Sequence, residues 1–291
     1  MIYSLENSKL KITASTYGGE IHSITSLDDG TEYLWNGNPE FWKYHAPILF
    51  PIVGKVKDLK YRVDGCEYEL PQHGLARISE FNLLNQTKDS ITFELRYTED
   101  SLKVYPYKFA LQIKYTISNN TVKVAYTVKN IDSKEIFFSI GAHPAFMCPI
   151  NSNESLEDYY FKFDEKETSS IMLLNEKGYF TGKREDYLEN NDKINLNTNV
   201  FKNDALVFDN LKSKTVTIQS DKTDKYLKVD FSEFPYLGLW APATGAPFVC
   251  IEPWFGHADY NDFSGEFSEK EGIQSLNVGE EFSCNYIISI E

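Results

Sequence analysis

Basic residues are scarce in this chain: 29 Lys and Arg stand against 43 Asp and Glu, which gives a formal net charge of -14. Nucleic acids and anionic membranes are bound by basic surfaces, so this charge argues against both as partners. No apolar run approaches the ~18 residues that a membrane-spanning helix needs, and the first residues lack the pattern of a secretory signal. We therefore expect a cytoplasmic protein.

Cysteine is also rare. The four residues, Cys66, Cys148, Cys250 and Cys284, are widely spaced and form neither a CxxC pair nor a dense disulfide framework. We expect reduced thiols in the hydrophobic core. The five histidines lack the short ligand spacings of common zinc motifs, so the sequence predicts no metal site.

Long amphipathic helices are missing as well, which excludes architectures built from βαβ units. Aromatic residues make up 15% of the chain, a composition typical of pleated sheets and of surfaces that stack on sugar rings. Apolar residues alternate over 109–117 and 122–128, around a turn at Asn119-Asn120, and predict a β-hairpin. We predict an all-β protein, a large antiparallel β-sandwich, with residues 1–291 as one domain.

Two stretches depart from clear alternation. Residues 151–200 are rich in Asn, Glu, Asp and Lys without a clean period, so we expect irregular excursions with a short helix near residues 155–160. Residues 46–55 are apolar but contain two prolines, so we expect an extended segment that leads to a loop at Lys55.

The most informative stretch is residues 248–254, in which four apolar residues precede Glu252, Pro253 and Trp254. Because proline cannot donate a ladder hydrogen bond, we expect a buried strand that stops at Glu252. Burial at such a place tends to raise the pKa of a carboxyl group, which suits a general base near neutral pH. The alternative is that Glu252 only holds a loop through backbone N–H groups.

Two of the histidines lie in tight turns. His73 precedes Gly74 and is followed four residues later by Arg77, and such a pair can converge on an oxygen-rich ligand. His143 follows a glycine-containing turn and precedes Pro144, so its imidazole is held in place. For both histidines, a purely structural hydrogen bond is the alternative.

Two charged residues are weaker candidates. Lys55 is either a solvated surface charge or a donor to a sugar hydroxyl or phosphate. Asp204 is either a loop cap or a ligand for hydroxyls.

Three motifs in this order carry a resemblance: residues 73–77 (HGLAR), 141–146 (GAHPAF) and 250–259 (CIEPWFGHAD). Together they resemble the aldose 1-epimerase (galactose mutarotase) superfamily, along essentially the whole chain. Residues 51–54 (PIVG), 73–77 and 252–259 resemble more closely its LacX-like branch. The resemblance implies a β-sandwich of the supersandwich type, with a sugar in an open cleft across the concave sheet.

The resemblance also implies residue roles. In the family, the histidine matching His143 protonates the ring oxygen, and the glutamate matching Glu252 removes the proton from the C1 hydroxyl. The histidine matching His73 holds and polarises the ring oxygen, while Arg77 and Asp204 are implied sugar contacts. Family members usually carry arginine at the position of Lys55, whose side chain keeps the charge but lacks the bidentate fork.

We therefore predict an aldose 1-epimerase, an isomerase that acts on a hexose as its small-molecule partner. Ring opening needs one proton delivered and one removed, so no cofactor is implied. Three hypotheses remain beside it: a hexose 6-phosphate 1-epimerase, a noncatalytic carbohydrate-binding protein, and a glycoside hydrolase with Asp204 or Asp259 as second carboxylate. The acidic chain favours a neutral sugar, and the oligomeric state is unknown from sequence.

Overall fold

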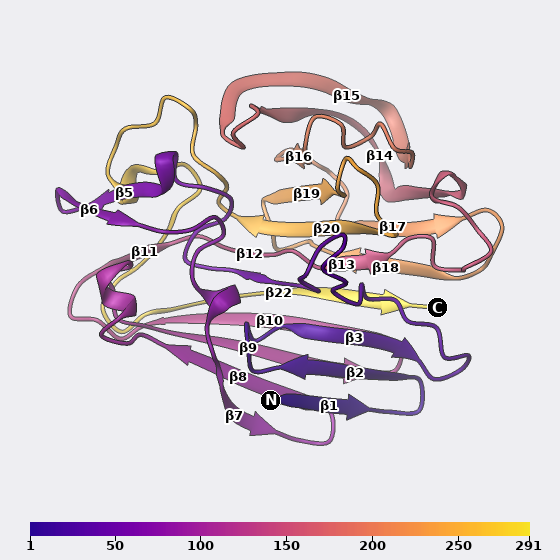
Figure 1. The fold of residues 1–291 in the computed structure, drawn as a ribbon, viewed down its shortest axis with the longest axis horizontal. Helices are drawn as coiled ribbons and strands as arrows, with labels where there is room; N and C mark the ends of the chain where they lie inside the picture. The colour runs from indigo at the N-terminus through magenta and orange to yellow at the C-terminus, as the bar shows by residue number, and fades with distance from the viewer.

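A computed structural model describes residues 1–291, which fold into β-strands and five short 3₁₀ turns without an α-helix. One sheet of 15 strands dominates (Figure 1). Its strands are β4 (Ile48–Leu49), β7 (Asn82–Gln86), β8 (Ser90–Arg96), β9 (Phe109–Ser118), β10 (Thr121–Asn130), β12 (Ile140–Ala142), β13 (Ala145–Met147), β14 (Tyr159–Leu174), β15 (Phe180–Asn195), β16 (Leu206–Phe208), β17 (Thr215–Ser220), β18 (Tyr226–Asp230), β19 (Tyr236–Trp240), β20 (Phe248–Phe255) and β22 (Glu281–Ile290). The predicted all-β fold, a large antiparallel β-sandwich, is confirmed.

Three smaller sheets complete the structure. They comprise β1 (Ile2–Glu6), β2 (Leu10–Ser15) and β3 (Ile21–Ser26); β5 (Lys60–Val63) and β6 (Cys66–Glu69); and β11 (Ile136–Phe138) with β21 (Gln274–Leu276). The 3₁₀ turns are Lys57–Leu59, Ala76–Ile78, Ser101–Lys103, Leu156–Asp158 and Phe267–Glu269. No helix is long and apolar enough to span a bilayer.

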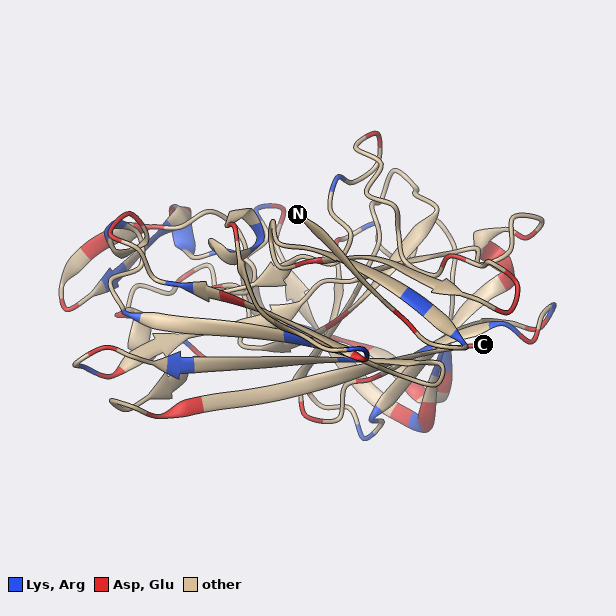
Figure 2. Cartoon of the chain, turned by 90° about the horizontal axis from the view of Figure 1, so that it is seen from below, with Lys and Arg blue, Asp and Glu red and all other residues tan.

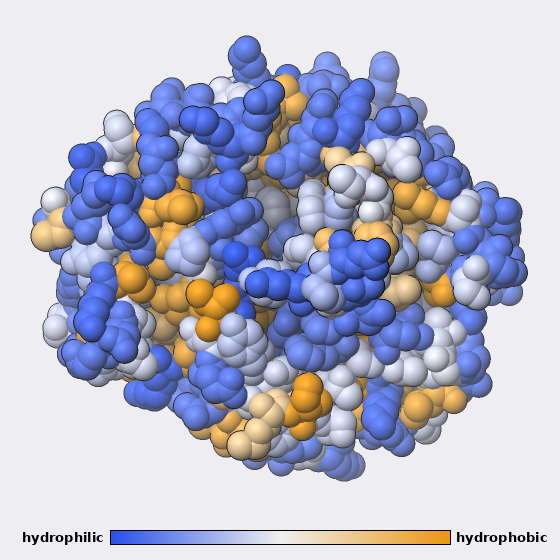
Figure 3. Space-filling model, viewed as in Figure 1, coloured by the Kyte–Doolittle hydropathy of each residue, from blue (hydrophilic) through white to orange (hydrophobic).

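The sheets enclose a core cluster of 67 buried residues. Alternation builds it, as in the predicted hairpin, where β9 and β10 pair Ile117 with Val122 and Tyr115 with Val124, all four of them buried. Charged residues lie mainly in loops and near strand ends (Figure 2). The outer surface is largely hydrophilic, and it is hollowed over β19 and β20 (Figure 3).

The prediction for residues 151–200 was wrong. Most of that segment forms the long strands β14 and β15, which pair with each other, and the expected helix is only the three-residue turn Leu156–Asp158. Register shifts interrupt the β14–β15 pairing, and β15 is mostly exposed, so neither strand shows a continuous apolar alternation. Bulges and solvent exposure thus removed the signal of period two.

The predicted end of β20 at Glu252 was also wrong, because the strand continues to Phe255. Ile251 donates its N–H to Pro144, so the nitrogen of residue 253 faces the same side, opposite Ala142, the last residue of β12. A proline is tolerated there because it stands at the end of the pairing with β12.

Two smaller expectations need correction. All four cysteines are free, but Cys66 is exposed, because it lies on the two-stranded β5–β6 ribbon rather than in the core. In the stretch of residues 46–55, only Ile48–Leu49 forms a strand. The bends that follow it end at Gly54, whose φ of 69° and close contact with Ala258 leave no room for a side chain.

Candidate active site

One cavity of about 450 Å³ gathers the residues predicted from sequence. It is lined by all six of them: Lys55, His73, Arg77, His143, Asp204 and Glu252. They come from loops and strand ends that lie far apart in the chain, and the sheet brings them together. Their roles in substrate binding and catalysis remain predictions.

Backbone register places His143 opposite Glu252. Gly141 pairs with Trp254, and Ala145 pairs with Cys250. Continuing this register by two residues from either pair places His143 opposite Glu252. The flanking hydrogen bond from Ile251 to Pro144 makes this a non-hydrogen-bonded position, where opposed side chains are closest. His143 Nε2 lies 3.2 Å from Glu252 Oε2.

Two glycines make room beside this pair. Gly238 lies opposite Glu252 on β19, and a Cβ there would come within 2.6 Å of the Trp254 ring. A Cβ on Gly141 would meet the same indole, also at 2.6 Å. Trp254 is therefore inserted between two positions that only glycine can occupy without displacing it.

Burial controls the protonation of the pair. It raises the pKa of Glu252 well above the usual value, and the negative charge of Asp204 acts in the same direction. Burial lowers the pKa of His143 to about 3, assisted by the positive charge of Arg77. Both shifts disfavour the charged forms, so burial favours a carboxylic acid beside a neutral imidazole, an arrangement in which the two side chains hold a single proton between them.

His73 is held in one tautomer. Its φ is 65°, and its Nδ1 accepts a hydrogen bond from the N–H of Gly54 at 3.1 Å. The proton of the neutral ring must then reside on Nε2, which becomes a donor. Burial lowers the pKa of His73 well below its usual value, and nearby cationic groups act in the same direction. The ring meets His143 edge-on, with centroids 5.5 Å apart.

The two cations in the cavity form no ion pair. Lys55 Nζ donates to the carbonyl oxygen of Lys177 at 2.9 Å, in the turn between β14 and β15. Arg77 donates to the carbonyl oxygen of Gln72 at 2.8 Å, and its guanidinium lies over the ring of Tyr44, 4.9 Å from the centroid. Arg77 Nε is buried without a hydrogen-bond partner, so both side chains retain donors for a ligand.

Asp204 is a loop cap, and its predicted role as a ligand for hydroxyls stays a prediction. Its Oδ1 accepts the backbone N–H of Ala205 at 2.8 Å, as a loop cap does, and its φ is 84°. The Asp204 side chain also lines the cavity. Its negative charge is the second largest cause of the raised pKa of Glu252, and burial is the largest.

The sequence interpretation missed an aromatic wall. Trp42 lies against His143 with ring centroids 4.8 Å apart, and Trp240 meets the same imidazole edge-on at 5.5 Å. Trp42 comes from an irregular loop, so no periodic pattern marked it. Its only signal in the sequence is that the chain has just four tryptophans.

Two groups of side chains hold metal-ligating atoms within 4.8 Å of one another. The first is His143, Cys250 and Glu252 in the cavity. Burial raises the pKa of Cys250 well above its usual value, so this thiol is protonated and is a poor metal ligand. The second group, Glu20, His22 and His45, lies outside the residues that line the cavity.

The fold and the cavity define a protein of the galactose mutarotase-like class. A solved galactose mutarotase related enzyme from Lactobacillus acidophilus matches with a TM-score of 0.95 and 35% identity, covering 100% of this chain and 97% of that one. A galactose mutarotase-like protein from Lactobacillus casei matches at 0.94 and 28% identity, with both chains fully covered.

Sequence comparison leads to the family. The family model described as "Aldose 1-epimerase" matches residues 1–275. Protein LacX (chromosomal) of Lactococcus lactis subsp. lactis is 37% identical over 264 residues, which are 88% of either chain. The chain belongs to the aldose 1-epimerase family, and the resemblance to its LacX-like branch is confirmed. Membership supports an isomerase of the sugar epimerase or mutarotase kind.

Proposed function

We propose that this protein is an aldose 1-epimerase that interconverts the α and β anomers of a free hexose without a cofactor, with residues 1–291 acting as one domain. The observation that carries the proposal is the buried His143–Glu252 pair, 3.2 Å apart on opposed strands of one sheet. A pair that holds one proton can accept a proton from one sugar oxygen while it donates one to the next.

The reaction moves one proton each way. In the ring-opening step, the Glu252 carboxylate takes the proton of the C1 hydroxyl, and the His143 imidazolium gives its proton to the ring oxygen. The C1–O5 bond breaks, C1 becomes an aldehyde carbon, and rotation about C1–C2 exposes its other face. Closure reverses both proton transfers, so the pair and the sugar regain their original protons.

The electrostatics of the cavity suit this cycle. The pair of carboxylate and imidazolium has the same total charge as the pair of carboxylic acid and neutral imidazole. Ring opening therefore changes only which of the two residues holds the proton, and the pair stays neutral. Burial favours the second arrangement, and sugar hydroxyls that hydrogen-bond to the carboxylate favour the first. A reversible proton relay requires the two arrangements to lie close in energy, and these two effects act in opposite directions.

The surrounding residues orient the sugar. In this proposal neutral His73 donates from Nε2 to the ring oxygen, and Arg77 and Asp204 form hydrogen bonds with hydroxyls. Trp42 and Trp240 form an apolar wall on which a sugar ring can pack. The free donors of Lys55 and Arg77 favour a second candidate substrate, a hexose 6-phosphate, whose phosphate they would bind.

Anomer exchange measured by NMR tests the proposal. Wild-type protein should accelerate exchange of glucose or galactose, and Glu252→Gln and His143→Asn should each remove most of that acceleration while sugar still binds. Equal acceleration by Glu252→Gln and wild type would contradict the proposed mechanism. Binding without acceleration by the wild type would identify a carbohydrate-binding protein instead.

The same assay separates the two substrate classes. We expect the free hexose to be turned over at least as well as its 6-phosphate, because the net charge of -14 opposes an anion. A strong preference for the 6-phosphate that is lost in Lys55→Ala or Arg77→Ala would establish the second candidate.

A further inference from the structure

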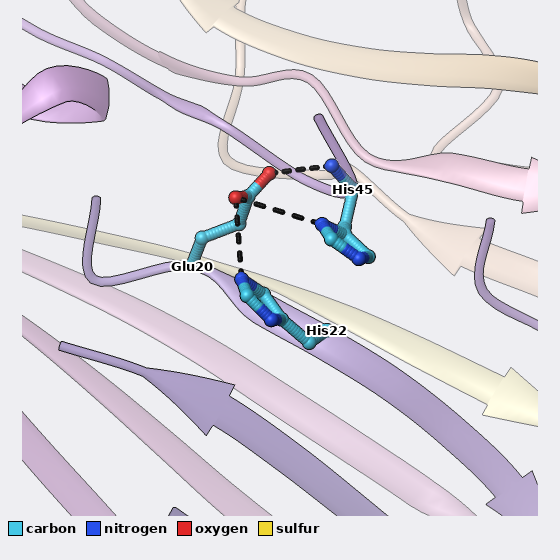
Figure 4. A group of neighbouring side chains, drawn as sticks. All are labelled: Glu20, His22 and His45. Carbon is cyan, nitrogen blue, oxygen red and sulfur yellow. Dashed lines mark hydrogen bonds and ion pairs between the residues drawn. The ribbon is translucent and has the colours of Figure 1, made fainter. Parts of the chain in front are cut away.

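A carboxylate and two imidazoles meet near the small sheet β1–β3, outside the residues that line the catalytic cavity (Figure 4). Glu20 directly precedes β3, His22 lies on β3, and His45 ends the irregular loop that leads toward β4. Glu20 Oε1 accepts the backbone N–H groups of His45 and Ala46, both at 2.6 Å. One carboxylate oxygen is thus fixed by the backbone, and the other is left to face the rings.

The distances from Glu20 Oε2 to the two rings resemble those between neighbouring ligands of one metal ion. Glu20 Oε2 lies 3.5 Å from His22 Nε2 and 3.8 Å from His45 Nδ1. These separations are long for hydrogen bonds. They are near the ~3.4 Å that separates neighbouring ligands about a tetrahedral zinc ion with bonds of about 2.0–2.1 Å. His45 Nδ1 is moreover buried without a hydrogen-bond partner.

We infer that Glu20, His22 and His45 bind one divalent transition-metal ion of the zinc type through Oε2, Nε2 and Nδ1. Two imidazoles and one carboxylate are a ligand set that zinc accepts, with the fourth position open to water. The site goes beyond the proposed epimerase activity and does not depend on it. It also departs from the expectation of no metal, which considered only short spacings along the sequence.

The backbone around the carboxylate supports the inference. The two backbone N–H groups on Oε1 act as the outer partners that orient a ligating carboxylate.

The rings must adjust when the ion binds. They are stacked, with centroids 4.0 Å and planes 10° apart, so an ion between them would lie out of both ring planes. His45 is held on one side, because its ring packs against the α-carbon of Gly37. His22 is the more exposed of the two and its ring makes no hydrogen bond, so His22 is the ring that turns.

The ion would join two segments of the chain that meet near the cavity. His45 accepts the N–H of Ala145 through its carbonyl oxygen at 2.9 Å, and Trp42, three residues earlier, packs on His143. Metal binding would tie the end of this loop to β3 through side chains as well as backbone.

Calorimetric titration of tag-free protein with Zn²⁺, repeated with Co²⁺ by absorption spectroscopy, tests the site. Wild-type protein should bind one equivalent. His22→Asn should weaken binding more than the about 10- to 100-fold that loss of an outer-shell partner costs, because it removes a ligand. Glu252→Gln is the matched control and should bind as tightly as the wild type, because it alters only the other cluster.

Each outcome is decisive. No saturable binding by the wild type overturns the site, as does binding that survives in His22→Asn but is lost in Glu252→Gln. Circular dichroism of His22→Asn checks its fold, and ring ¹⁵N shifts of the wild type on adding Zn²⁺ report ligation directly should this variant not fold. None of these measurements uses anomer exchange. Failure of the metal site therefore leaves the proposed function standing, and failure of the proposed function leaves the metal site standing.

Discussion

Trp254 donates from its indole nitrogen to the carbonyl oxygen of Ala142 across 3.2 Å. In the register of β12 and β20, that oxygen lies opposite residue 253, and an N–H there would have been its partner. Pro253 has none, so the next side chain along the strand provides the hydrogen bond. The Trp254 side chain thus replaces the missing backbone hydrogen bond beside His143, which lies between the end of β12 and the start of β13.

Trp254→Phe tests the contribution of this side-chain hydrogen bond. The variant keeps an aromatic ring between Gly141 and Gly238 but leaves a buried carbonyl without its donor, which should cost about 1–3 kcal/mol of unfolding free energy. Anomer exchange should also slow, because the backbone next to His143 is less firmly held. Urea unfolding and NMR exchange measure the two effects. An unchanged unfolding midpoint would show that the hydrogen bond is dispensable.

The proposed proton relay predicts a pattern among variants. Glu252→Gln and His143→Asn should each slow anomer exchange by roughly 100- to 10,000-fold, the usual contribution of one positioned acid or base. The double variant should be little slower than the slower single variant, because the two groups act as a unit. Multiplicative effects would instead indicate that the residues act in separate steps.

The protonation of the pair predicts a wide pH range of activity. Activity needs one proton on the pair, so it should fall only when a second proton binds or when the single proton leaves. The pKa of His143, lowered by burial to about 3, sets the acidic limit, and the pKa of Glu252, raised by burial, sets the alkaline one. A rate profile that rises through pH 6.5, with the ordinary pKa of a histidine, would contradict this assignment.

Stability should depend on pH through the same carboxyl group. The folded state keeps the proton of Glu252 above pH 4.5, where the unfolded chain has released it, because burial raises its pKa in the folded protein. Stability is therefore lost as the pH rises from 4.5 toward the folded-state pKa. Glu252→Gln cannot ionise, so its melting temperature should exceed that of the wild type by a margin that grows with pH. Glu99→Gln, at an exposed position, is the control for removal of one negative charge from the chain.

Chelation tests the absence of a catalytic metal. Exhaustive treatment with a chelator should leave the rate of anomer exchange intact, because every proposed proton transfer runs between side chains and the sugar. A loss of activity that zinc restores in the wild type and in His22→Asn alike would refute this mechanism, because that variant lacks a ligand of the site at Glu20, His22 and His45.

The sequence predicted those parts of the molecule that local patterns encode. Alternation from Phe109 to Val128 identified a hairpin because successive side chains of a strand point to opposite faces of the sheet, one facing the core and the next facing away from it. Candidate residues such as His73, His143 and Glu252 could be found because glycine and proline turns or a buried strand flank them. All the predicted site residues then proved to line one cavity.

Other features depend on contacts between distant segments. Trp42 packs on His143 from an irregular loop, and Glu20 meets His45 only because that loop returns to β3. The long strands β14 and β15 were missed because bulges and exposure break their pattern. In each case the deciding interaction joins residues that no spacing along the chain relates.

The opposed placement of His143 and Glu252 has a consequence for tolerance to insertions and deletions. Because side chains alternate between the faces of a sheet, adding or deleting one residue between Gly141 and Ala145 would turn one partner away from the other. Loops elsewhere can lengthen with little penalty. This three-residue connection is therefore the segment of the chain whose length is least free to change among active descendants.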